Sequence, residues 1–166
     1  MRHTIGTLVL LATLGVAPAA AQKPGGELHG NYSRTTGTHT QSWGAGTLFA
    51  VTLGGKAPLN ANTSLGLDYL KQEKGGPGEV TVSYDAVLQP GGNSTVTPYA
   101  GGSVGANWST GDQKAWNGAK LGLETIGGVQ VKVGTSGVAW KLEERFGYVR
   151  GQEHTLTTRL GVVFSK

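Results

Sequence analysis

Two runs near the C-terminal end of the chain constrain the fold more than any other stretch, because each alternates between apolar and polar side chains. In the run 138–148 the large apolar side chains share one parity, and they are Val138, Trp140, Leu142, Phe146 and Tyr148. The opposite parity carries Lys141, Glu143 and Arg145 in mid-run, and the run 155–164 again alternates. Successive side chains of a strand point to opposite faces, so each run predicts a strand with one apolar face. Charges at the centre of the other face are typical of a membrane barrel, which turns its apolar side to lipid and its polar side inward.

The composition excludes several other classes of protein. No stretch beyond the N-terminus approaches the about 20 apolar residues of a spanning helix, which excludes a helical membrane protein. The chain has no cysteine, so disulfides and cysteine-based zinc sites are excluded. The net charge of +4 is mild and its basic residues are dispersed, so we expect no nucleic-acid partner.

The first 21 residues have the composition and order of a secretory signal peptide. Arg2 precedes the mostly apolar stretch 5–17, and small alanines follow Pro18. An N-terminal membrane anchor is the alternative, but the apolar stretch is too short to span a bilayer. We therefore expect a cleaved signal peptide over 1–21 and one barrel domain over 22–166.

Alternation and turn residues together predict eight strands in the mature chain. The predicted ranges are 27–33, 43–53, 63–72, 79–88, 96–108, 118–133, 138–148 and 155–164. Gly127 and Gly128, inside the sixth range, suggest a bulge or bend. Segments of about 10 residues match tilted membrane strands, and eight is the smallest usual number for a closed membrane barrel. The predicted fold is an all-β, eight-stranded antiparallel up-and-down transmembrane barrel.

Aromatic residues of the apolar parity are predicted to form a girdle at each rim, since amphipathic rings prefer the membrane interface. The predicted girdle residues are Tyr32, Trp43, Tyr69, Trp108 and Tyr148 at the upper rim and Trp140 and Phe164 at the lower rim. Chance placement in a soluble barrel is the alternative.

Charges of both signs on the inward parity must pair in a confined interior, so we expect an ionic plug rather than a wide pore. The predicted members are Asp68, Asp85, Lys120, Glu124, Lys132, Lys141, Glu143, Arg145 and Arg159. Glu144 has the lipid-facing parity, which is costly in mid-bilayer. We therefore expect Glu144 near a rim or beside a bulge.

Three segments resemble the small outer-membrane β-barrels of the OmpA/OmpX type, and the resemblance covers residues 26–166. They are 98–105 (PYAGGSVG), 142–146 (LEERF) and 160–164 (LGVVF). The resemblance implies an eight-stranded barrel with periplasmic termini, inserted by the barrel-assembly machinery through its final strand. That strand usually ends in an aromatic residue, whereas here Ser165 and Lys166 follow Phe164. The family shares no catalytic residues, so the resemblance implies none.

The three histidines of the mature chain give little sign of chemistry. His29 stands alone on its predicted strand, and His39 and His154 fall in loops at one rim. We expect no metal, no cofactor and no catalysis, although Glu153 and Thr155 flank His154.

The leading hypothesis is a monomeric outer-membrane barrel of a Gram-negative-type bacterium, with a structural or interaction role or a very narrow conductance. Its partners would be outer-membrane lipid and the assembly machinery. One alternative is a soluble secreted or periplasmic barrel that binds an apolar ligand, as lipocalins do. A second is a lipid-modifying barrel enzyme.

Overall fold

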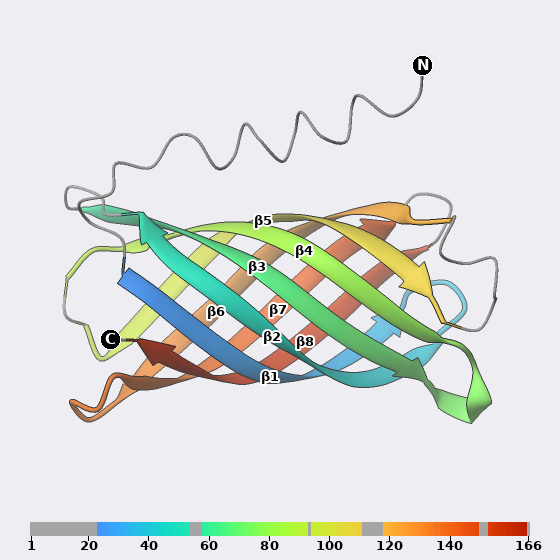
Figure 1. Cartoon of the computed structure of the whole chain (residues 1–166), viewed down its shortest axis with the longest axis horizontal. Coiled ribbons are helices and arrows are strands. Elements are labelled where there is room, and N and C mark those ends of the chain that lie inside the picture. Colours follow the sequence, from blue (N-terminus) through green and yellow to red (C-terminus); the bar gives the residue numbers. More distant parts are fainter. Residues whose placement is uncertain (1–22, 54–57, 93, 111–117, 150–152, 166) are drawn as a thin grey trace, which may run out of the picture.

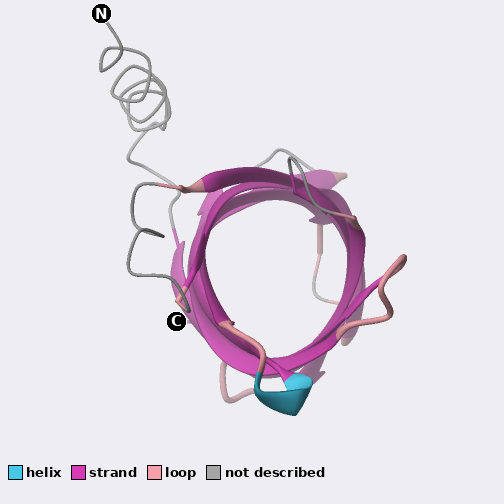
Figure 2. Ribbon diagram, turned by 90° about the vertical axis from the view of Figure 1, so that its right-hand side faces the viewer, coloured by secondary structure: helices cyan, strands magenta, loops and turns pink. Residues whose placement is uncertain are grey.

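The computed structural model describes residues 23–53, 58–92, 94–110, 118–149 and 153–165. These residues form eight strands around a closed ring and one short 3-10 turn, η1 (Glu73–Gly75) (Figures 1 and 2). The strands are β1 (Lys23–Thr35), β2 (Gln41–Leu53), β3 (Leu59–Gln72), β4 (Gly78–Pro90), β5 (Val96–Ser109), β6 (Lys120–Val133), β7 (Val138–Val149) and β8 (His154–Ser165). The predicted signal peptide lies outside the described residues.

Every strand pairs antiparallel with its neighbour in the sequence, and β1 pairs with β8 to close the barrel. The predicted all-β, up-and-down, eight-stranded architecture is therefore confirmed. The strands are longer than predicted at several ends; β3, for example, begins at Leu59 rather than at residue 63. Polar and turn-forming residues continue the ladder there, because their backbones find partners on the adjacent strand. In the described part of the chain, no helix is long and apolar enough to cross a membrane.

The barrel is inside-out relative to a water-soluble protein. The largest fully buried side chains are Arg145 and Glu143, whereas Trp140, Leu142 and Phe146 on the same strand are 47–53% exposed. The same alternation holds along the other strands, where large apolar side chains cover the outer surface. Buried apolar side chains are few among the described residues, namely Leu48, Tyr99, Ile126 and Ala139.

The register of the strands fixes the height of each residue along the barrel axis. A row of paired residues that starts at Lys71 of β3 passes through Trp43, Tyr32, Thr158 and Glu144. The row continues through Gly127, Ala100 and Leu88 and returns to β3 at Ala61, ten residues below its start. Such a stagger means that the strands tilt and that each row descends as it goes round the barrel.

Two predictions about local distortions are wrong. Gly127 and Gly128 form no bulge, because the pairing of β6 with β5 and with β7 runs through both residues without a shift. Gly128 instead leaves room for the ring of Tyr99, which a side chain at Gly128 would strike.

Glu144 is neither near a rim nor beside a bulge. It is the fourth of eight steps along the row from Lys71 to Ala61, at half the height of the barrel.

Candidate functional site

The middle of the barrel interior is filled by an ionic plug centred on Arg145 of β7. The guanidinium donates from Nε to Glu143 (2.5 Å) and from Nη1 to Glu124 (3.0 Å) and Asp85 (3.2 Å). Its Nη2 also donates to Asp85, so the grip on that carboxylate is bidentate. Alternation along β7 turns Arg145 and Glu143 to the same side, while the register of the sheet supplies partners from β4 and β6. A planar fork of donors suits several carboxylates at once.

A second cluster lies across the lumen from Arg145 and is centred on Asp68 of β3. Asp68 accepts hydrogen bonds from Arg159 Nη2 (2.6 Å) and Asn31 Nδ2 (2.6 Å), and its Oδ1 lies 2.7 Å from His29 Nε2. The other ring nitrogen of His29 lies 3.1 Å from Glu27. All five residues are at most 5% exposed, so the cluster is buried.

Lys141 and Tyr99 connect the two clusters. The ammonium of Lys141 lies 2.7 Å from Glu27 and 2.9 Å from Glu143. The hydroxyl of Tyr99 donates to Glu143 (2.9 Å), and Arg159 Nη1 lies 3.6 Å from Glu143. Glu143 is thus shared by several donors, and the network joins the two clusters into one unit.

The structure brings together seven of the nine residues predicted for the plug. They are Asp68, Asp85, Glu124, Lys141, Glu143, Arg145 and Arg159. Lys120 and Lys132 do not join them. Both lie near the ends of β6, where side chains of the inward parity reach solvent. Sequence analysis missed Glu27, His29, Asn31 and Tyr99 as members. Their inward parity was the available signal, but their partners come from distant strands.

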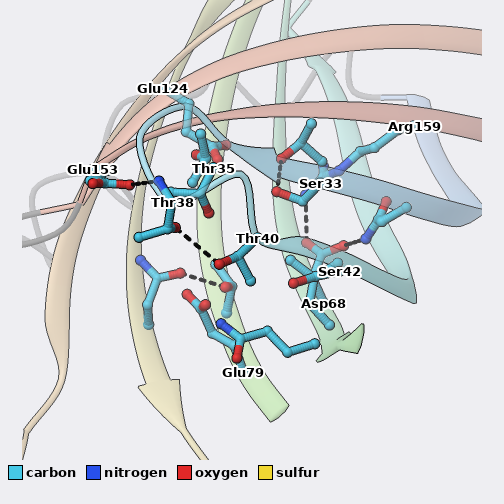
Figure 3. A pocket seen from close by; sticks show the side chains of 17 residues that line it. Ser33, Thr35, Thr38, Thr40, Ser42, Asp68, Glu79, Glu124, Glu153 and Arg159 are labelled. Atoms are coloured by element: carbon cyan, nitrogen blue, oxygen red, sulfur yellow. Dashed lines mark hydrogen bonds and ion pairs between the residues drawn. The ribbon is translucent and has the colours of Figure 1, made fainter. Parts of the chain in front are cut away.

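Above the plug, toward the end of the barrel with η1, the lumen widens into a polar vestibule of about 360 Å³ (Figure 3). Asp68 and Arg159 form its floor, and its walls carry mainly hydroxyl and amide side chains such as Ser33, Thr157 and Asn107. The lining also holds Glu79, Glu124 and Glu153, against the single cation Arg159 among the described lining residues. The vestibule is therefore acidic and suits water or polar solutes rather than apolar ligands.

The predicted girdle residues occupy the two ends of the outer surface. Tyr32 packs on Trp43 with ring centroids 4.5 Å apart, and the Trp43 indole donates to Glu73 (2.8 Å) at the η1 end. The remaining members at that end are Tyr69, Trp108 and Tyr148. Trp140 and Phe164 lie near the opposite end, beside the turn 134–137.

Among the described residues around His154, the contacts of its imidazole are aromatic rather than those of a nucleophile and base. Its imidazole stacks on Phe146, with centroids 5.3 Å apart, and lies 5.5 Å from the Tyr148 ring. Glu153 accepts a hydrogen bond from the Thr38 backbone instead of orienting the imidazole (2.6 Å). Within the described ranges, no group of three or more His, Asp or Glu residues is arranged to hold a metal ion.

Comparison with known proteins identifies the fold but no sequence relative. No family model matches the chain, and no curated protein matches it. Among solved structures, Neisserial surface protein A (NspA) aligns over 89% of this chain and 98% of its own, with 16% identity and a TM-score of 0.62. The attachment invasion locus protein Ail of Yersinia pestis aligns over 87% and 97%, with 11% identity and a TM-score of 0.58.

The outer membrane enzyme PagL aligns over 83% of this chain and 98% of its own, with 13% identity and a TM-score of 0.53. These proteins share the fold of this chain over nearly their whole length, and identities this low establish the fold alone. The chain thus has the fold of the small eight-stranded outer-membrane β-barrels, consistent with the resemblance to the OmpA/OmpX type.

Proposed function

We propose that this protein is an outer-membrane barrel with a structural or interaction role, whose lumen is blocked by the ionic plug. The observation that carries the proposal is the inversion along β7. Arg145 and Glu143 are 1% exposed, whereas Trp140 and Leu142 are about half exposed on the outside. Such a surface is stable in hydrocarbon and would aggregate in water.

The polar interior argues against a soluble barrel that carries an apolar ligand. A lipocalin-like protein needs an apolar cavity, but the middle of this lumen holds paired charges and the vestibule above is lined by hydroxyl, amide and acidic groups. The plug also argues against a wide conductance, because moving an ion through it requires breaking several buried ion pairs.

Export and insertion complete the proposal. The predicted signal peptide would carry the chain across the inner membrane, and the barrel-assembly machinery would insert it through β8. Phe164 lies on the outer surface one residue before this strand ends at Ser165.

A lipid-modifying enzyme is the rival proposal, since the outer membrane enzyme PagL has the same fold. The aromatic packing of His154 and the hydrogen bond of Glu153 favour a surface without catalysis. No lipid turnover by the purified wild type would support this view. Turnover by the wild type that His154→Ala abolishes would contradict it.

The lipid-facing surface can be tested directly, because the chain has no cysteine and a single one can be introduced anywhere. A fluorophore on Leu67→Cys, outward at mid-height, should be quenched strongly by brominated acyl chains in vesicles. The same fluorophore on Thr40→Cys, at the rim, should be quenched weakly. A chain that stays folded and monomeric in water without detergent, with equal weak quenching at both sites, would overturn the proposal.

A further inference from the structure

The outer surface carries an acidic side chain at a depth where a membrane barrel should have no charged group. Glu144 points outward from β7, is exposed, and stands at half the height of the barrel. Its neighbours on the same face of β7, Leu142 and Phe146, are both large and apolar. A polar group facing hydrocarbon at mid-bilayer is unfavourable unless it finds a partner.

The barrel itself satisfies only part of this side chain. The hydroxyl of Thr158, directly across on β8, donates to Glu144 Oε1 at 2.8 Å. The nearest cations in the sheet are Lys141 and Arg145 of β7 itself and Arg159 of β8, and all three have the inward parity and are committed to the plug. Within the described residues, no ion pair reaches Glu144, and its hydrogen bond from Thr158 leaves Oε2 unoccupied.

The strand on the other side leaves a notch next to the carboxyl. Gly127 of β6 pairs with Glu144, and a Cβ built on Gly127 would have no atom within 4 Å. The outer surface is therefore indented at Gly127, and the backbone of another protein can approach closely there, as small residues allow in membranes.

We infer that Glu144 and the notch at Gly127 form the centre of a contact with a second copy of this chain within the membrane. In a twofold contact only a residue at the axis meets its own copy, so Glu144 at the centre of the contact would meet Glu144. In hydrocarbon the stable form of a carboxyl is neutral. Two neutral carboxyls pair through two reciprocal hydrogen bonds, with the proton of each Oε2 donated to the facing carboxyl. The contact is isologous and closes at two copies.

The chemistry of the surface favours a second copy over a cationic partner. A charged partner would leave one ion pair in hydrocarbon, whereas two identical acids need no charge at all. This inference replaces the expected monomer, and it rests on the proposed placement of the barrel in a membrane.

The affinity of one copy for another can be measured in phosphatidylcholine vesicles by energy transfer between fluorophores. The fluorophores are attached at Thr135→Cys, because Thr135 is exposed in the turn between β6 and β7. Energy transfer between labelled copies that keep Glu144 should rise with the protein-to-lipid ratio. Glu144→Leu should weaken association about tenfold, which corresponds to about 1.4 kcal/mol. Glu144→Gln should retain most of the affinity, since two primary amides also pair reciprocally.

The face of the contact can be identified by cross-linking with a short bis-maleimide. Leu142→Cys, beside Glu144, should give a covalent dimer. The matched control is Leu67→Cys, which lies at similar height on β3, four strands away, and should remain monomeric. An inserted barrel that is monomeric at all ratios, equal association in Glu144→Leu, or cross-linking at Leu67→Cys would each overturn the inference. These outcomes leave the proposed function standing, whereas failure of brominated lipids to quench Leu67→Cys would contradict the proposed function itself.

Discussion

Replacing Arg145 with methionine should destabilise the barrel more than any other substitution of a single charge in the plug. Arg145 is 1% exposed and donates to three carboxylates, on Asp85, Glu124 and Glu143. Methionine fills similar space but leaves these carboxylates without their shared cation. Removing one partner of a buried ion pair typically costs about 3–5 kcal/mol, and we expect a loss in that range.

The three carboxylates should not contribute equally to this loss. Glu124 is 27% exposed and can turn to water, and Glu143 keeps Lys141 at 2.9 Å. Asp85, which is 3% exposed, has Arg145 as its only ion-pair partner among the described residues. Adding Asp85→Asn to Arg145→Met should therefore recover about 1–3 kcal/mol, the usual cost of leaving a buried polar group unsatisfied.

The measurement is equilibrium unfolding in urea of the barrel in lipid vesicles, followed by tryptophan fluorescence. Arg34→Met is the matched control, because Arg34 is exposed and contacts His39 at the rim. The control should change the free energy of unfolding by at most about 0.5 kcal/mol. A loss below about 1 kcal/mol in Arg145→Met, or no recovery in the double variant, would refute the view that the plug is a buried and mutually dependent network.

Two further substitutions test the packing around the plug. Gly128→Ala should destabilise the barrel by about 1–3 kcal/mol, as overpacking does, because the new methyl group would lie 2.7 Å from the Leu142 carbonyl oxygen and strike the Tyr99 ring. Gly127→Ala, whose methyl group would point into open space, should leave the unfolding free energy in detergent nearly unchanged, and equal losses in both variants would contradict the packing described. Tyr99→Phe should cost about 1–2 kcal/mol by removing the hydrogen bond to Glu143, and an unchanged urea midpoint would show that this bond contributes nothing.

The strands and the direction of their faces could be predicted from the sequence, because both depend on local order along the chain. A period of two places Trp140 and Leu142 on one face and Lys141, Glu143 and Arg145 on the other, whatever the strand pairs with. Charges in the middle of one face and an apolar opposite face favour an enclosed, internally paired polar face, and only the closed structure shows that Glu143 and Arg145 lie inside. The inverted barrel was therefore the leading prediction from the sequence.

The composition of the plug depended on the tertiary structure, because parity tells which face a residue has but not its height. Lys120 and Lys132 have the inward parity and yet lie at the strand ends, beyond the paired charges. His29 is the one histidine of its predicted strand, and the curvature of the sheet brings Asp68 of β3 to its imidazole, which also contacts Glu27 of the same strand.

The height of Glu144 along the barrel axis likewise depended on the stagger of the closed sheet. Parity alone assigns Glu144 to the lipid-facing side, but whether it reaches a rim depends on how far each row descends as it goes round. The row through Glu144 falls ten residues along β3 in one circuit, from Lys71 to Ala61, and this descent places the carboxyl halfway up the barrel. Alternation is a property of one strand and can be read along the chain, whereas height is a property of all eight strands together and exists only once the barrel has closed.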